Sequence, residues 1–502
     1  MARINDLPNN ILGLILYYAA ATPDIMLYEW KAKLPLVAVC RTWTKLAQGF
    51  VFHEVYVEVD DTFSNNRPSW TSNAGFLISR GCILKARRLK MELADPITSE
   101  CLRSIALEEL QLDRVDWQHI NALTVTGPSP VHEYDLHGIE PEEASDEDIA
   151  RTIKYFAQNL RNVVELKLNY DKSGVLELTL DSSTACILPS ICGETLRVLK
   201  LYDVPHNFAW HHFRYDIFVR PIVFHQLTIL HLFFQLEDKN QTLTEVEIQD
   251  KIASGAHNCD QLSFPALRKL LVNDCTPDCD LLYADIPFPE LKDVHLIGTI
   301  ASIRHCCRLK LTWVRDLHVD VYTNSLDNAT DIYQVTNHFF TDIFIGRTAS
   351  FSTAVDWFTL DPELMRWANL TILEVDKADY ATACKTVGRL PNLCELTIRK
   401  LVMSSYIEDS SLFTSADPLL AWGEKLAILY IYFFEGDCPL ADCVGSIQDL
   451  ILHAGALKKL DVPDSSRSSI DWFIGTYADR YPHLADIQLF DEWTGHVNKY
   501  GE

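Results

Sequence analysis

Basic residues are scarce in this 502-residue sequence, which carries 44 Lys and Arg against 69 Asp and Glu for a formal net charge of −25. A field of that sign repels phosphate backbones and anionic membranes, so neither nucleic acid nor a membrane is an expected partner. Long apolar runs are lacking too. The longest uncharged one near the N-terminus, Ile11 to Ala21, is about half of what a membrane-spanning helix needs. It follows Asp6 and has no basic flank, unlike a signal peptide. We expect a soluble protein of the cytoplasm or nucleus.

Paired-cysteine motifs are also absent. The 14 cysteines are scattered through apolar segments without a single CxxC, which indicates mostly reduced core residues. The closest approaches to metal-ligand spacing lack a second matching pair at zinc-site distance. They are Cys275-x3-Cys279, His305-Cys306-Cys307 and Cys438-x4-Cys443. We expect neither a metal nor a cofactor.

Catalytic signatures are missing as well. The sequence has no phosphate-cradling glycine loop, no GxSxG elbow, no HExxH pair and no kinase motif set. The histidines His206, His211 and His212 lie beside Pro205 and Trp210 in a predicted loop, where packed or surface histidines are the simpler interpretation. No enzymatic activity is expected, and a hydrolase or transferase with an unrecognised site is the minor alternative.

What is present begins with two amphipathic helices. Asp6 is a suitable N-cap and Pro8 falls in the first turn, where its missing N–H does no harm. Apolar residues then recur at three- and four-residue spacing in both predicted helices. They are Leu7, Ile11, Leu12, Ile15 and Leu16 in the first, and Leu36, Val39, Cys40, Trp43 and Leu46 in the second. Periodicity alone favours a helical cap that packs on the rest of the chain.

The identity of these residues points further. The pattern LPxxILxxIL from residue 7, followed by LxxVCRxWxxLA from residue 36, resembles the F-box family, in particular fungal F-box-like proteins whose boxes precede divergent leucine-rich repeats. The resemblance implies an F-box over residues 1–50 that binds the Skp-type adaptor of a cullin-RING ubiquitin ligase. The residues that would contact the adaptor are Leu7, Pro8, Ile11, Leu12, Ile15, Val39, Cys40 and Trp43. The long gap at 17–33 departs from compact boxes.

A second pattern, LxxLxL with conservative replacements, occurs eleven times downstream. The matches begin at Val163, Leu196, Leu227, Leu267, Leu291, Val314, Leu370, Leu393, Leu426, Leu457 and Leu484. Further units are expected at Ala86-x-x-Leu89-x-Met91, Leu107-x-x-Leu110-x-Leu112 and Phe340-x-x-Ile343-x-Ile345. Such repeats place one short strand on an inner curve and a helix or irregular return on the outer curve. We therefore predict an α/β fold: a curved leucine-rich-repeat solenoid over residues 51–502, with parallel strands inside and helices outside. A proline-containing acidic insertion at 127–148 is predicted to be a solvated loop.

Alternate side chains of each predicted strand should point out from the inner curve, about 5 Å from those of the neighbouring strands. His295 and His318 should then lie side by side, with three carboxylates around them. The candidate substrate-binding residues are His231, Phe233, Asp293, His295, Asp316, His318, Asp320, Tyr430 and Tyr432. A mix of aromatic and polar groups suits a protein ligand, although a merely hydrated face is an equal alternative.

Together these patterns predict a substrate-recognition subunit of a Skp-cullin-F-box ubiquitin ligase, which binds the adaptor through the box and an unknown protein substrate through the repeats. The alternative is a leucine-rich-repeat interaction scaffold with no ubiquitin-ligase role.

Overall fold

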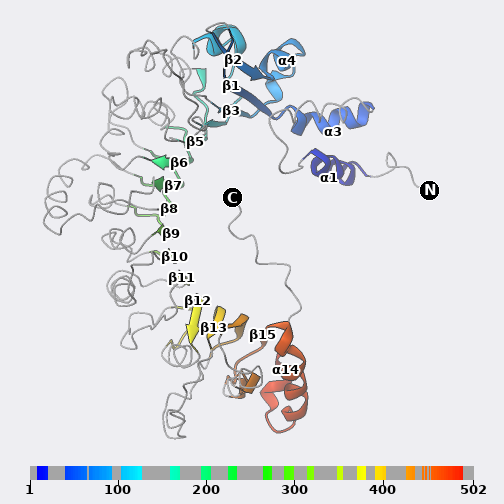
Figure 1. Cartoon of the computed structure of the whole chain (residues 1–502), viewed down its shortest axis with the longest axis vertical. Coiled ribbons are helices and arrows are strands. Elements are labelled where there is room, and N and C mark those ends of the chain that lie inside the picture. The colour runs from blue at the N-terminus through cyan, green and yellow to red at the C-terminus, as the bar shows by residue number, and fades with distance from the viewer. Residues whose placement is uncertain are drawn as a thin grey trace, which may run out of the picture. The chain divides into compact units, whose positions relative to one another are not determined.

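The computed structural model describes eighteen stretches of the chain. They are residues 8–20, 40–64, 67–92, 103–126, 159–169, 194–204, 224–234, 264–273, 288–298, 314–321, 348–353, 370–379, 390–402, 425–435, 444–445, 447–448, 451–452 and 454–489. The chain forms two compact units. Unit 1 comprises 1–267 and 278–290, and unit 2 comprises 268–277 and 291–502. Figure 1 shows the described helices and strands in colour.

Unit 1 contains a sheet whose strands follow the chain order except at its edge, where β1 lies between β2 and β3. Its strands are β1 (Glu54–Ser64), β2 (Arg67–Ser72), β3 (Arg88–Glu92), β4 (Ala122–Thr126), β5 (Glu165–Asn169), β6 (Val198–Val204) and β7 (Ile229–Phe234). The strands β1 and β2 form an antiparallel pair at the edge. From β1 onward, β3 to β7 are added one after another in parallel.

Unit 2 continues the same construction with parallel strands in chain order. Its strands are β8 (Lys269–Asn273), β9 (Asp293–Gly298), β10 (Asp316–Val321), β11 (Thr348–Thr353), β12 (Ile372–Asp379), β13 (Glu395–Val402), β14 (Ile428–Glu435), β15 (Lys459–Asp461) and β16 (Gln488–Leu489). In the sequence, the last two strands are separated by the helix α14 (Asp464–Tyr477) and the 3-10 turn η11 (Pro482–Asp486).

The repeat template explains this arrangement. The last two template positions of a repeat are core-facing residues of one strand, as in β7, where Leu230 and Leu232 are fully buried and His231 between them is half-buried. The first position, Leu227 in this repeat, is buried in a turn in which its N–H donates to the carbonyl of Phe224. Each of the eleven template matches carries one parallel strand, so the predicted leucine-rich-repeat-like fold with a long parallel sheet is confirmed.

Phenylalanines add a second layer to the core of unit 1. Phe224, Phe264 and Phe288 each precede a template match by three residues, and all three are buried. Their rings stack along the sheet, with centroids 5.4 Å apart for the first pair and 5.9 Å for the second. Neither repeat can bury its phenylalanine alone, which joins neighbouring repeats into one core.

The predicted unit at Leu107-x-x-Leu110-x-Leu112 is wrong. Residues 105–109 form a π-helical turn, η3 (Ile105–Glu109), in which Leu107 is exposed. The strand of this repeat is β4, whose residues follow the pattern Ile120-x-x-Leu123-x-Val125. A three-residue leucine spacing is also helical, so the template alone could not separate the two conformations.

The expected unit at Phe340-x-x-Ile343-x-Ile345 lies outside the described residues, and the strand between β10 and β12 begins later. It is β11, in which Ala349 and Phe351 pair with Leu317 and Val319. The acidic insertion at 127–148, the histidines at 206–212, the three cysteine groups and most of the predicted outer helices also fall outside the described residues.

Two short helices precede the sheet of unit 1. Figure 1 shows α1 (Asn9–Ala20) beside α3 (Arg41–Val51), and the two pack together. Leu12 and Leu16 of α1 are buried, as are Ala47 and Val51 of α3. Three smaller elements follow: α4 (Ala74–Ser79), the 3-10 turn η2 (Ile83–Lys85) and η3. Among the described residues, no helix has the length and hydrophobicity to cross a membrane.

Candidate binding surface

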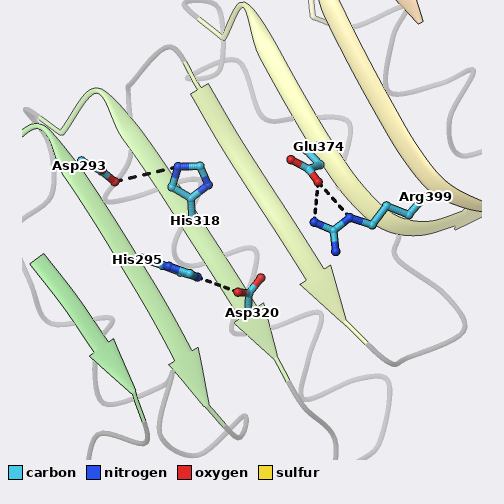
Figure 2. A network of polar contacts seen from close by, with 6 residues as sticks. All are labelled: Asp293, His295, His318, Asp320, Glu374 and Arg399. Carbon is cyan, nitrogen blue, oxygen red and sulfur yellow. Dashed lines mark hydrogen bonds and ion pairs between the residues drawn. The ribbon is translucent and has the colours of Figure 1, made fainter. Parts of the chain in front are cut away.

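Four polar side chains cross-connect β9 and β10 in unit 2. The strand register pairs His295 directly with His318, and their ring centroids lie 5.7 Å apart. Each histidine faces a carboxylate of the other strand (Figure 2): His295 Nε2 is 2.7 Å from Asp320 Oδ2, and His318 Nε2 is 4.0 Å from Asp293 Oδ1. The predicted adjacency of the two histidines is therefore confirmed.

Burial and charge oppose each other in this cluster. Burial is the largest influence on the pKa of His318 and lowers it, and the neighbouring His295 lowers it further. The carboxylates of Asp293, Asp320 and Asp316 act in the raising direction without reversing the shift. His318 is thus held preferentially as the neutral imidazole.

Two of the surrounding carboxylates form ion pairs with basic side chains of unit 2. Lys269 Nζ lies 3.5 Å from Asp293 Oδ2, and Arg315 Nε lies 2.9 Å from Asp316 Oδ2. The 4.0 Å separation from His318 is too long for a hydrogen bond, and Asp293 Oδ1 is buried without one in the described part of the chain. No group of three or more His, Cys, Asp or Glu among the described residues is arranged to hold a metal ion.

A second polar pair lies further along the same sheet. Arg399 on β13 donates from both Nε and Nη2 to Glu374 Oε1 on β12, at 3.0 and 2.7 Å (Figure 2). On β14, Tyr430 and Tyr432 stack with centroids 6.4 Å apart. Burial raises the pKa of Tyr432, and the negative charges of Asp461 and Glu374 add to that effect. This part of the face therefore combines a fixed guanidinium with two phenol rings.

Sequence reasoning missed Glu374 and Arg399. The alternation that selects Asp293 and His295 also selects these two residues in the repeats that begin at Leu370 and Leu393, so the signal was present. It is weak there because charged residues at alternate positions of an exposed sheet face are common.

The other two predicted residues, His231 and Phe233, lie on the inner face of unit 1. Phe233 stacks on Tyr202 with ring centroids 4.5 Å apart and planes 7° apart, and His231 meets Phe233 edge-on at 6.4 Å. Lys167 Nζ lies 4.5 Å from the centre of the Tyr202 ring. The candidate residues are thus divided between the two units.

The predicted adaptor-binding residues are also divided. Pro8, just before α1, is exposed, as are Ile11 and Ile15 on α1, whereas Cys40 and Trp43 are half-buried. Leu12 is only 1% exposed. Leu7 and Val39 lie outside the described residues.

Several solved structures are distantly similar to this chain. An internalin from Listeria monocytogenes is 11% identical, with a TM-score of 0.30, 70% of this chain covered and 89% of the internalin. A leucine-rich-repeat protein from Leptospira interrogans is 10% identical, with a TM-score of 0.27, 82% of this chain covered and 91% of the other. No family model and no curated protein matches the sequence. Similarities of this size transfer no function to the chain.

Proposed function

We propose that this protein is a substrate-recognition subunit of a Skp-cullin-F-box ubiquitin ligase. In this proposal α1 and α3 bind the adaptor, and the repeats bind the protein that is to be modified. The chain catalyses no covalent step. It raises the effective concentration of the target near a ubiquitin-charged enzyme held by other subunits.

The observation that carries the proposal is the apolar strip on α1, formed by Ile11, Leu14 and Ile15. These side chains are 41%, 53% and 38% exposed, and they make up three of the seven large hydrophobic residues that are exposed in the described part of the chain. A cluster within two helical turns marks an interaction surface more strongly than scattered apolar residues do. It coincides with the LPxxILxxIL pattern on which the F-box resemblance rests.

The inner face of unit 2 supports the second half of the proposal. Tyr430, Tyr432 and Arg399 belong to the residue types that dominate the energetics of protein interfaces. The neighbouring His295 and His318 add polar groups, and the 2.7 Å contact with Asp320 orients the His295 ring. An exposed sheet face with this composition favours a protein ligand over a small apolar molecule.

Co-purification with a purified Skp-type adaptor tests the proposal. The double variant Ile11→Glu/Ile15→Glu places two charges in the apolar strip at exposed positions, so the helix pair should stay folded. Loss of two interface anchors should weaken adaptor binding by about 100-fold or more. Leu84→Glu is the matched control, because Leu84 is 62% exposed on η2, away from the strip.

The same experiment separates the proposal from its alternative, an interaction scaffold with no ligase role. The alternative is favoured by the tight packing of α1 on α3, in which Leu12, Leu16, Ala47 and Val51 are buried as they would be in a simple cap. If the wild-type chain does not retain the adaptor, or if the double variant retains it as well as wild type does, the ligase role is wrong.

A further inference from the structure

Three lysines lie in one row on the inner face of unit 1, in a chain that is strongly acidic overall. Lys90 on β3, Lys167 on β5 and Lys200 on β6 share a register level, which Thr124 on β4 and His231 on β7 complete. No carboxylate falls in this row. With neighbouring strands about 4.8 Å apart, the five positions span roughly 19 Å. We call Lys90, Lys167 and Lys200 the lysine row.

The lysine row is only partly neutralised by its surroundings. Lys200 Nζ lies 3.3 Å from Glu165 Oε1, and Lys90 pairs with Glu92 on its own strand. Lys167 has no ion-pair partner among the described residues and rests instead over the Tyr202 ring. Burial is the main cause that lowers the pKa of Lys167, and the charges of Lys200 and Lys90 lower it further. An anion placed here would relieve this repulsion.

Two aromatic rings adjoin the lysine row on its C-terminal side. Tyr202 and Phe233 are stacked in parallel, and both are half-exposed. The stack leaves part of its apolar area exposed beside the Lys167 ammonium, which lies 4.5 Å from the Tyr202 ring centre. Positive charge and apolar area are therefore available to one ligand together.

We propose that the lysine row and the Tyr202–Phe233 stack form a binding site for a short acidic protein segment that lies across the strands. In an extended peptide, alternate side chains on one side are about 6.7 Å apart, so some six residues would span the row. Acidic residues of that segment would face the three ammonium groups, and an apolar residue would cover the aromatic stack. This inference specifies the chemical class of the ligand that the repeats bind. It rests on the proposed function only in treating the repeats as protein-binding. It does not depend on α1.

Nucleic acid fits this surface less well. Its backbone carries a charge at every residue, whereas Glu92 and Glu165 border the lysine row on either side along the strands. The net charge of −25 would repel the remainder of a polyanion. A short segment with few charges avoids both penalties.

Fluorescence anisotropy with the full chain tests the proposal. The probe is a fluorescein-labelled peptide of six glutamates and one phenylalanine. The ligand control is the same peptide with every glutamate changed to glutamine. Lys90→Gln/Lys167→Gln/Lys200→Gln should weaken binding of the glutamate peptide about tenfold or more, since three partly exposed ion pairs are lost. Binding should also weaken as salt is added.

The control variant Lys85→Gln/Lys425→Gln/Lys458→Gln changes the net charge equally at three exposed lysines away from the row, and it should bind like wild type. The variant Lys90→Arg/Lys167→Arg/Lys200→Arg should retain binding, because it keeps the charges.

Equal affinity of the glutamine variant of the lysine row and the glutamine control variant for the glutamate peptide would overturn the site. Tighter, row-dependent binding of a single-stranded oligonucleotide of equal charge would overturn the ligand class. Neither result depends on the adaptor, so failure here is distinguishable from failure of the ligase role.

Discussion

His318 is the residue whose surroundings most clearly resist protonation. Its imidazole is directly opposite that of His295, and the charge of that neighbour disfavours a charge on His318. Asp293, Asp316 and Asp320 favour the charged form, but burial outweighs them and the pKa of His318 lies below its usual 6.5. Protonation of the folded protein is therefore harder at this position than protonation of the unfolded chain.

A stability difference between neutral and mildly acidic pH follows. Below about pH 6.5 the unfolded chain takes up a proton at residue 318 before the folded protein does, so this group lowers stability as pH falls through that value. The variant His318→Asn should show a smaller drop in the urea midpoint between pH 7.5 and pH 5.5 than wild type. His225→Asn, in a turn of unit 1, is the control. An unchanged drop in His318→Asn would show that this imidazole is not resisting protonation.

At the scale of single strands, most of the sheet could be predicted from the sequence. The template matches from Val163 to Val314 all place their Leu and Val residues in buried positions, because the core-facing residues of a repeat strand meet only apolar neighbours. The strand β11 was not predicted because Ala349 and Phe351, which pair with Leu317 and Val319 of β10, stand in a segment that is otherwise Ser and Thr. The strand β4 was not predicted because the patterns that begin at Leu107 and Ile120 lie within twenty residues of each other. Packing, which the template does not describe, decides between them.

The candidate surface was predictable to a lesser degree. Strand alternation and register placed His295 beside His318, because those are backbone properties. Alternation and register could not predict the diagonal contact of His295 with Asp320 or that of Arg399 with Glu374. Both contacts depend on side-chain rotamers and on the twist between strands. The lysine row was missed because its three members lie in three separate repeats and share one register level only across the sheet.

The phenylalanine stack gives a prediction for the repeat as an element. Phe264 is completely buried between Phe224 and Phe288, so Phe264→Ala would leave a cavity shared by neighbouring repeats. We expect a loss of about 3–5 kcal/mol in the free energy of unfolding, measured by urea denaturation. Phe264→Leu should lose less, because it keeps most of the volume.

The matched control is Phe433→Ala on β14, where the ring is 56% exposed. Its effect should stay within about 0.5 kcal/mol, as expected for a surface substitution. Equal destabilisation by Phe264→Ala and Phe433→Ala would mean that the stacked rings contribute nothing beyond their own repeat.

The whole molecule combines a large negative charge with a local positive surface. Because each repeat contacts mainly its neighbours, stability is a sum of local terms, and a charge imbalance distributed along the chain weakens many of them slightly. The acidic excess should also add specificity to the lysine row, since the net charge of −25 opposes the approach of a short acidic ligand and the three lysines attract it locally.

Screening should therefore stabilise the folded chain. With a net charge of −25, adding sodium chloride from 0.05 to 0.5 M shortens the range of repulsion between carboxylates and should raise the Tm in differential scanning calorimetry. The rise should be a few degrees at most, since 1 kcal/mol shifts the Tm of a large domain by only about 2–4 °C. An uncharged osmolyte at equal osmolality is the control for preferential exclusion. If Tm falls with salt, the ion pairs, such as Arg399 with Glu374, outweigh self-repulsion, and the net charge is not what limits stability.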